Sequence, residues 1–128
     1  MDKQAVSVLI IEDERIVALD LQTKLRSLGY GVCAYGPSGE AALELVREHH
    51  PDVVLMDIML EGTLDGIEAA SKIREIADTP VVFLTAYTDE ETRTRAFATN
   101  YCVFLAKPVD LANLDRAVRE ALNLTAPK

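Results

Sequence analysis

Three consecutive acidic residues, Glu12, Asp13 and Glu14, directly follow the apolar run Val8–Ile11. Carboxylates at this density repel one another, so they need a cation or hydrogen-bond donors when they lie together at the end of a buried strand. Hard cations such as Mg²⁺ take oxygen ligands of this kind. The acidic run therefore indicates a candidate metal site.

Single polar residues follow three later apolar runs in the same way, and they are Asp57, Thr85 and Lys107. Carboxylates, a divalent cation, a lysine and a hydroxyl group together can stabilise a phosphoryl group in transfer. A carboxylate can also be the nucleophile and form an aspartyl phosphate. Asp57 is the best candidate, because no acidic residue adjoins it. The sequence shows no Gly-rich nucleotide cradle, so we expect the phosphoryl group to come from another molecule.

Five apolar runs alternate with stretches of helical periodicity, and this order predicts the fold. The expected strands are Val6–Ile11, Val32–Tyr35, Val53–Met56, Val81–Leu84 and Cys102–Ala106. Continuous apolar runs are typical of strands that are covered on both faces. The alternation predicts an α/β fold with a doubly wound, mainly parallel sheet and helices on both faces. Such sheets form their sites at the carboxyl ends of strands, where all of the polar residues above are expected.

The expected helix at Asp89–Thr99 is the least apolar one, since only Ala96–Ala98 offers clear apolar contacts. Few buried contacts would oppose its movement. We therefore expect this helix, with the fifth strand and helix, to form the face that changes when a phosphoryl group is bound. Arg93 and Arg95 are interpreted as part of a solvated surface. Tyr87, two residues after Thr85, is bulky enough to shield an acyl phosphate from water.

Length and charge limit the function classes. A chain of 128 residues fits one domain, with a core at about residues 5–123 and a short carboxyl-terminal tail. The net charge of −8 argues against binding to nucleic acid or to a membrane surface. Cys33 and Cys102 show no metal-binding or redox spacing. No signal peptide or membrane span is visible in the sequence, so the cytoplasm is the expected location.

The ordered set of motifs resembles the receiver domain of two-component response regulators, the CheY-like superfamily. The stretches that carry the resemblance cover nearly the whole chain: Glu12-Asp13, Val54–Leu60, Asp65-Gly66, Leu84–Ala86 and Lys107-Pro108. The resemblance implies a flavodoxin-like (βα)5 fold with strand order 2-1-3-4-5. It also implies a cis peptide bond between Lys107 and Pro108.

The same resemblance implies how a phosphoryl group would be held. Asp57 would be the phosphoacceptor, and Lys107, Thr85 and the backbone NH of Ala86 would contact the phosphoryl oxygens. Phe104, three residues before Lys107, stands at the position of the family's switch aromatic and would act together with Thr85.

A magnesium site is implied beside the phosphoacceptor. Asp13, Asp57 and the backbone carbonyl of Met59 would bind Mg²⁺, with Mn²⁺ as an alternative ion. Glu12 would act through a metal-bound water. Glu14 is interpreted instead as a charge that favours the start of the first helix.

The function implied is a phosphorelay switch that accepts its phosphoryl group from a sensor histidine kinase or a phosphotransfer protein. Such a module is no conventional enzyme, although it promotes its own phosphorylation and dephosphorylation. A homodimer that depends on phosphorylation is a further expectation. The sequence names neither the kinase nor the output partner, and it leaves open whether the chain is free-standing.

Three alternatives come from other classes of protein. A receiver fold could serve only as an interaction module, but the complete set of Asp13, Asp57, Thr85 and Lys107 argues against this. A flavodoxin-like electron carrier would need a phosphate loop after its first strand, where the acidic run would repel a phosphate. A phosphatase with an aspartate nucleophile would need an acidic residue in place of Met59.

The sequence departs from the receiver pattern in the loop after the phosphoacceptor. The stretch Leu60–Gly66 is one residue longer than in many receivers and lacks a proline. Asn100 stands where a glycine is common, although asparagine also tolerates the left-handed conformation at a helix end. The sequence therefore does not predict the shape of the loop beside the metal site.

Overall fold

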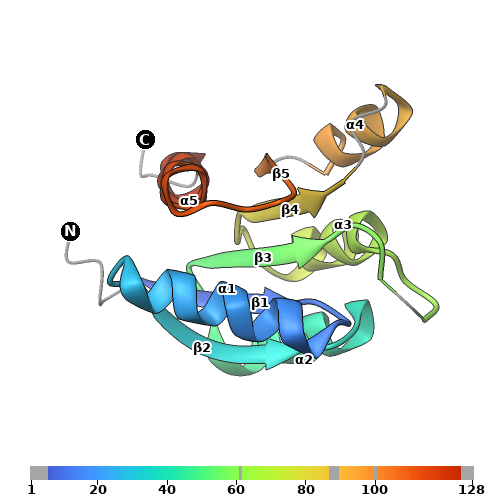
Figure 1. Cartoon of the computed structure of the whole chain (residues 1–128). Helices are drawn as coiled ribbons and strands as arrows, with labels where there is room; N and C mark the ends of the chain where they lie inside the picture. Colours follow the sequence, from blue (N-terminus) through green and yellow to red (C-terminus); the bar gives the residue numbers. More distant parts are fainter. Residues whose placement is uncertain (1–5, 61, 87–89, 100, 125–128) are drawn as a thin grey trace.

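The computed structural model describes residues 6–60, 62–86, 90–99 and 101–124. Strands and helices alternate strictly along this part of the chain (Figure 1). They are β1 (Ser7–Ile11), α1 (Arg15–Ser27), β2 (Gly31–Gly36), α2 (Gly39–His49), β3 (Val53–Asp57), α3 (Gly66–Ile76), β4 (Val81–Thr85), α4 (Glu90–Phe97), β5 (Cys102–Ala106) and α5 (Leu111–Leu124). Tyr87 and Asn100 lie outside the described residues.

The strands form one parallel sheet in the order β2-β1-β3-β4-β5, which confirms the predicted doubly wound fold. The order reverses at β1, which lies between β2 and β3. Ile11 of β1 pairs with Met56 of β3, so the residues that follow these strands emerge side by side. In a sheet of this type the carboxyl ends near such a reversal are where ligands bind.

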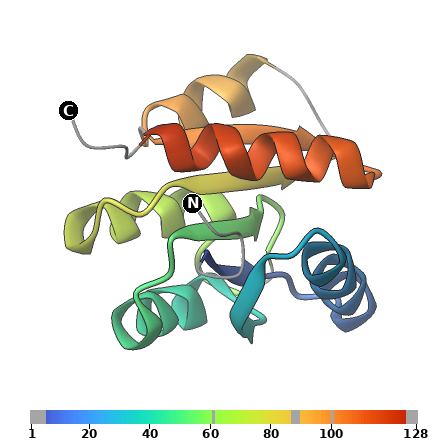
Figure 2. The same ribbon diagram turned by 90° about the vertical axis from the view of Figure 1, so that its left-hand side faces the viewer.

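Two apolar layers cover the sheet, one on each face (Figures 1 and 2). Successive side chains of a strand point to opposite faces, so Val8 and Ile10 pack with α1 and α5, whereas Leu9 and Ile11 pack with α2 and α3. Every residue of β3 and β4 is buried. Unbroken apolar runs are the sequence counterpart of this double burial.

Helix α4 is the least anchored of the described helices, as the sequence predicts. Ala96 is its one buried residue, whereas α3 buries five residues. Phe97 is 52% exposed. Arg74 of α3 fastens the segment after α4, because its guanidinium donates a hydrogen bond to the carbonyl of Thr99 at 3.1 Å. The end of α4 is therefore fixed more firmly than its outer face.

The loop after β3 accommodates its additional residue by lying against α2. Thr63 donates a hydrogen bond from its hydroxyl group to the carboxylate of Glu40 in α2, at 3.1 Å. Asp65 then starts α3 in a capping box, in which its side chain accepts from the NH of Glu68 and the Glu68 side chain accepts from the NH of Asp65. The longer loop is thus held at Thr63 and at Asp65.

Gly66, the first residue of α3, lies against the backbone at the end of β3. Its NH donates to the carbonyl of Ile58 at 2.9 Å. A Cβ atom at this position would collide with the carbonyl oxygen of Asp57 and lie 2.9 Å from the Cα of Ile58. A residue without a side chain is therefore needed where α3 meets the end of β3.

We predict that Gly66→Ala lowers the free energy of unfolding by about 1–3 kcal/mol, because backbone atoms must shift to admit the methyl group. Urea unfolding followed by circular dichroism measures the change. Ser71→Ala, on the exposed side of the same helix, is the matched control and should leave the midpoint unchanged or slightly raised. Equal midpoints for Gly66→Ala and the wild type would contradict the prediction.

Candidate functional site

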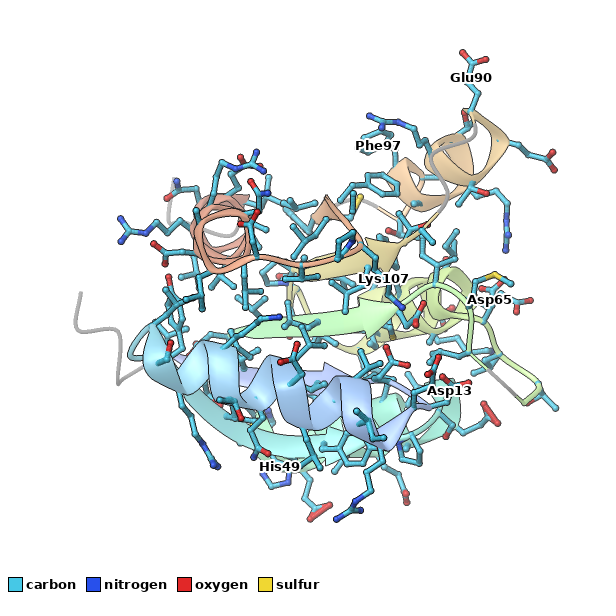
Figure 3. The ribbon with its side chains drawn as sticks, in the orientation of Figure 1. Asp13, His49, Asp65, Glu90, Phe97 and Lys107 are labelled. Atoms are coloured by element: carbon cyan, nitrogen blue, oxygen red, sulfur yellow. The ribbon has the colours of Figure 1, made fainter. Side chains whose placement is uncertain are left out.

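Three carboxylates meet at the carboxyl ends of β1 and β3. Glu12, Asp13 and Asp57 each place an oxygen atom within 4.8 Å of the others. Glu12 is 0% exposed, Asp57 is buried, and Asp13 is partly exposed. Lys107, after β5, reaches the same end of the sheet (Figure 3). The structure therefore brings together these four residues from three separate segments of the chain.

The donors to these carboxylates are unequally distributed. Asp57 accepts the NH of Met59 at 3.0 Å on one oxygen and the Nζ atom of Lys107 at 2.7 Å on the other. Glu12 accepts the NH of Glu14 at 3.1 Å on Oε2. Its buried Oε1 has no hydrogen bond to any described residue and lies 3.6 Å from the Nζ atom of Lys107. One buried carboxylate oxygen is thus left for a further ligand.

Burial is the main reason that the pKa of Glu12 rises to about 7, and the neighbouring Asp57 raises it further. Burial by itself would lower the pKa of Lys107, but the hydrogen bond and charge of Asp57, with the charge of Glu12, outweigh this effect and leave that pKa raised. One lysine faces three carboxylates here. The oxygen donors, the excess negative charge and the unsatisfied Oε1 of Glu12 all fit a hard divalent cation.

The remaining predicted residues lie at neighbouring strand ends. Thr85 is buried as the last residue of β4, and its carbonyl accepts the NH of Lys107 at 3.0 Å. Ala86, which follows it, is exposed. The peptide bond between Lys107 and Pro108 is cis, as the resemblance implies. Phe104 lies on β5, packed between the rings of Phe83 and Phe97.

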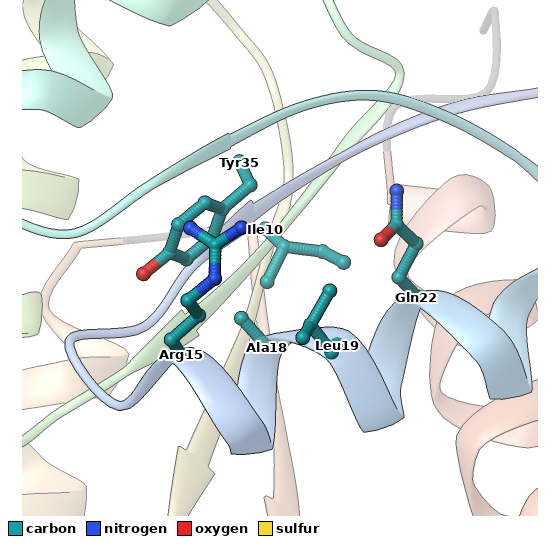
Figure 4. Close-up of a pocket in the computed structure, with 6 residues that line it drawn as sticks. All are labelled: Ile10, Arg15, Ala18, Leu19, Gln22 and Tyr35. Atoms are coloured by element: carbon teal, nitrogen blue, oxygen red, sulfur yellow. The ribbon is translucent and has the colours of Figure 1, made fainter.

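Two apolar side chains of α1 are exposed beside the site. Ile16, three residues after Asp13, is 83% exposed, and Leu19 is also exposed. A cavity of about 150 Å³ lies between α1 and the sheet (Figure 4). Its lining consists of Ile10, Arg15, Ala18, Leu19, Gln22 and Tyr35. A partner that approaches the carboxylates from this side would therefore meet apolar side chains.

Two arginines of α4 make contacts that the sequence interpretation missed. Arg95 pairs with the carboxylate of Asp65 at 3.1 Å, and the guanidinium of Arg93 lies over aromatic rings. Both residues are exposed, as expected, but neither is simply solvated. The spacing of Arg93 and Phe97, four residues apart on a helix, was the available signal.

Residues 8–119 match the sequence pattern of the response regulator receiver domain. The chain belongs to the response regulator receiver family. The match includes Glu12, Asp13, Asp57, Thr85 and Lys107, and receiver domains are phosphorylation-based switches of two-component signalling. No helix in the described part of this receiver is long and apolar enough to cross a membrane.

Curated relatives share the receiver region but are longer. The transcriptional regulatory protein PdtaR of Mycobacterium tuberculosis is 36% identical over 116 residues, which cover 91% of this chain and 56% of PdtaR. The transcriptional regulatory protein ZraR of Escherichia coli is 36% identical over 123 residues, which cover 95% of this chain and 27% of ZraR. The chain thus spans about half or less of the length of these relatives.

Solved receiver structures superpose closely on this chain. The signal receiver domain of a modulated diguanylate cyclase from Desulfovibrio desulfuricans has a TM-score of 0.83 and 40% identity, over 91% of this chain and 93% of that one. CheY in the CheX–CheY–BeF3–Mg complex from Borrelia burgdorferi has a TM-score of 0.82 and 26% identity, over 88% of this chain and 86% of that one. The CheY-like fold is thereby shown.

We predict that Glu12→Gln stabilises the protein in magnesium-free buffer, and more so at pH 8 than at pH 5. The folded pKa of about 7 lies above the usual glutamate value of 4.5, so the folded state binds the proton more tightly than the unfolded state. The resulting stabilisation is complete below about pH 4.5 and is lost as the pH rises through 7. Glutamine keeps the uncharged state, which should add about 1–3 kcal/mol at pH 8.

Thermal unfolding of the wild type and of Glu12→Gln at pH 5 and pH 8 measures the gain in stability at each pH. Glu14→Gln removes an exposed charge two residues away and is the matched control, for which we expect little change. An equal gain for Glu12→Gln at pH 5 and pH 8 would show that the charge of Glu12 is not the destabilising element.

Proposed function

We propose that this receiver accepts a phosphoryl group on Asp57 from a phosphohistidine of a sensor histidine kinase or a phosphotransfer protein. The observation that carries the proposal is the convergence on Asp57 of Lys107, at 2.7 Å, and of two further carboxylates. Both oxygens of Asp57 are held by donors at hydrogen-bond distance, from Met59 and Lys107. It is thereby oriented as a nucleophile.

The transfer is a displacement at phosphorus. A carboxylate oxygen of Asp57 attacks the phosphorus atom, the bond from phosphorus to the imidazole nitrogen breaks, and its electron pair returns to the histidine. The Nζ atom of Lys107, the hydroxyl group of Thr85 and the backbone NH of Ala86 then donate to the phosphoryl oxygens. Later attack by water on phosphorus restores the carboxylate and releases inorganic phosphate. The chain promotes both steps on itself and turns over no separate substrate.

A divalent cation completes the proposed site. Asp13, Asp57 and the backbone carbonyl of Met59 would hold Mg²⁺, or Mn²⁺ in its place, and Glu12 would act through a bound water. The buried Oε1 of Glu12, which lacks a hydrogen bond from any described residue, supports this assignment. When bound, the ion supplies positive charge that offsets the charge of the incoming phosphoryl group. The CheY of Borrelia burgdorferi, which is described with BeF3 and Mg, offers a parallel.

The phosphoryl group is proposed to act on the face formed by α4, β5 and α5. It adds about −1.5 to −2 charges and three acceptor oxygens, which draw Thr85 and Lys107 toward Asp57. Movement of the Thr85 side chain leaves space that Phe104 can enter from β5. Helix α4, with Ala96 as its one buried residue, resists such a change least. The output partner would read this face, and a second copy of the chain is one such partner.

The exposed apolar side chains of α1 support an approach of the phosphodonor from that side. Ile16 follows Asp13 by three residues and is 83% exposed. A protein that presents phosphohistidine to Asp57 must cover the carboxylate edge of the sheet, and Ile16 and Leu19 then lose contact with water. Their burial would favour the complex.

Incubation with Mg²⁺ and acetyl phosphate should yield one phosphoryl adduct in the intact mass of the wild type. Asp57→Asn should give none, because an amide is no nucleophile toward phosphorus. Asp52→Asn, which changes an exposed aspartate before β3, is the matched control and should retain the adduct. Failure of the wild type to form an adduct, or an equal yield in Asp57→Asn, would refute phosphorylation of Asp57.

Binding of beryllium trifluoride with Mg²⁺ should change amide exchange in α4 and β5 more than in α2. The reason is that α4 has the fewest buried residues among the described helices. A shift of Thr85 and Phe104 should therefore displace α4 more easily than α2. Hydrogen–deuterium exchange with mass spectrometry measures the protection of each peptide. Unchanged protection across α4 and β5, with the phosphoryl mimic bound, would refute the proposed output face.

A further inference from the structure

An aromatic stack on α4 and β5 carries an arginine on its outer side. The rings of Phe97 and Phe104 meet edge to face, with centroids 5.1 Å apart and an interplanar angle of 74°. The guanidinium carbon of Arg93 lies 5.2 Å from the centroid of Phe104 and 5.8 Å from that of Phe97. Figure 3 shows Phe97 on the side of α4 that faces β5 and α5. One cation therefore contacts both rings at once.

The stack is one of the contacts between α4 and the rest of the fold. Ala96 is the one buried residue of the helix, and Phe97 is half-exposed. Arg93, Phe97 and Phe104 also line a cavity of about 490 Å³ on the face formed by α4, β5 and α5. Phe104 touches the buried ring of Phe83 on its inner side, with centroids 6.0 Å apart. The ring of Phe104 thus lies between the core and Arg93.

We propose that Arg93 is a positioning residue that holds Phe104 in its outward packing and so opposes the switch. The inference rests on the proposed function, in which Phe104 moves toward the space beside Thr85. Phe104 would leave both Arg93 and Phe97 in that movement, so these contacts exist in the resting state alone. A contact made in only one of two states shifts their equilibrium by its own free energy.

The size of the effect follows from the exposure of Arg93. Exposed cation–π contacts are modest, and losing one would shift the equilibrium between outward and inward Phe104 by about 2- to 5-fold. Arg93 therefore sets how much of the resting protein already has the phosphorylated conformation. A phosphoryl mimic that selects the inward state should bind more tightly when Arg93 is absent.

The test compares the affinity for beryllium trifluoride with Mg²⁺ by calorimetry in the wild type, Arg93→Ala and Arg95→Ala. Arg95→Ala is the matched control, because it removes the same charge from the same helix. Arg95 contacts Asp65 and not the rings of Phe97 and Phe104. Loss of a positive charge alone weakens binding of an anion. We expect Arg93→Ala to bind about 2- to 5-fold more tightly than the wild type, opposite to that charge effect, and Arg95→Ala to show no tightening.

The same comparison in a Phe104→Leu background shows whether the effect passes through the ring. There the Arg93→Ala change should no longer tighten binding, as in a double-mutant cycle between contacting residues. Weaker binding by Arg93→Ala, or equal tightening with and without Phe104, would overturn the proposal.

A second measurement separates this proposal from the proposed function. The chain has three phenylalanines, so labelling with fluorophenylalanine gives three fluorine resonances, and Phe104→Leu identifies the one from Phe104. Without Mg²⁺ or mimic, that resonance should move in Arg93→Ala and stay in Arg95→Ala. An unmoved resonance would overturn the role of Arg93. Absence of mimic binding in the wild type would instead count against the proposed function and leave this result standing.

Discussion

Repulsion between buried carboxylates is the constraint on which the rest of this structure depends. Neighbouring parallel strands that are covered on both faces bring Glu12, Asp13 and Asp57 to one edge, with oxygens within 4.8 Å of one another. Lys107 is the lysine that the structure places against them, and it pairs directly with Asp57. Such an arrangement is unfavourable unless a cation binds or a proton is taken up. The fold thus stabilises a site that is complete only with its ligands.

The helices differ in how many side chains they bury against the sheet, and this difference supports the proposed direction of output. Helices α3 and α5 bury several side chains against the sheet, whereas α4 buries Ala96 alone. Gly66 lets the start of α3 lie against the backbone after Asp57, so this side of the site is closely packed. Under the proposed function, a rearrangement around phosphorylated Asp57 therefore meets least resistance toward β5 and α4.

The fold and most of the site followed from the sequence because both rest on local patterns. Continuous apolar runs predicted the strands, and the polar residue after each run predicted which side chains would share one edge. The unsatisfied oxygen of Glu12 and the packing of Arg93 on two rings were not predicted. The state of the Glu12 oxygen depends on segments that are far apart in the chain and leaves no signal in the sequence. The helical spacing of Arg93 and Phe97 was a signal for one ring contact, but the contact of Arg93 with Phe104 depends on how α4 packs against β5.

Helix α4 is held on two sides by contacts that are individually weak. Arg93 and Arg95 are two residues apart, so they project about 200° from one another around the helix axis. One contacts the ring of Phe104 and the other pairs with Asp65, which also caps α3 after the phosphoacceptor loop. Exposed contacts of these types contribute about 1 kcal/mol or less each. Under the proposed function, movement of Phe104 breaks its weak contact with Arg93 but not the pair of Arg95 with Asp65, and a single phosphoryl group on Asp57 can outweigh a contact of that size.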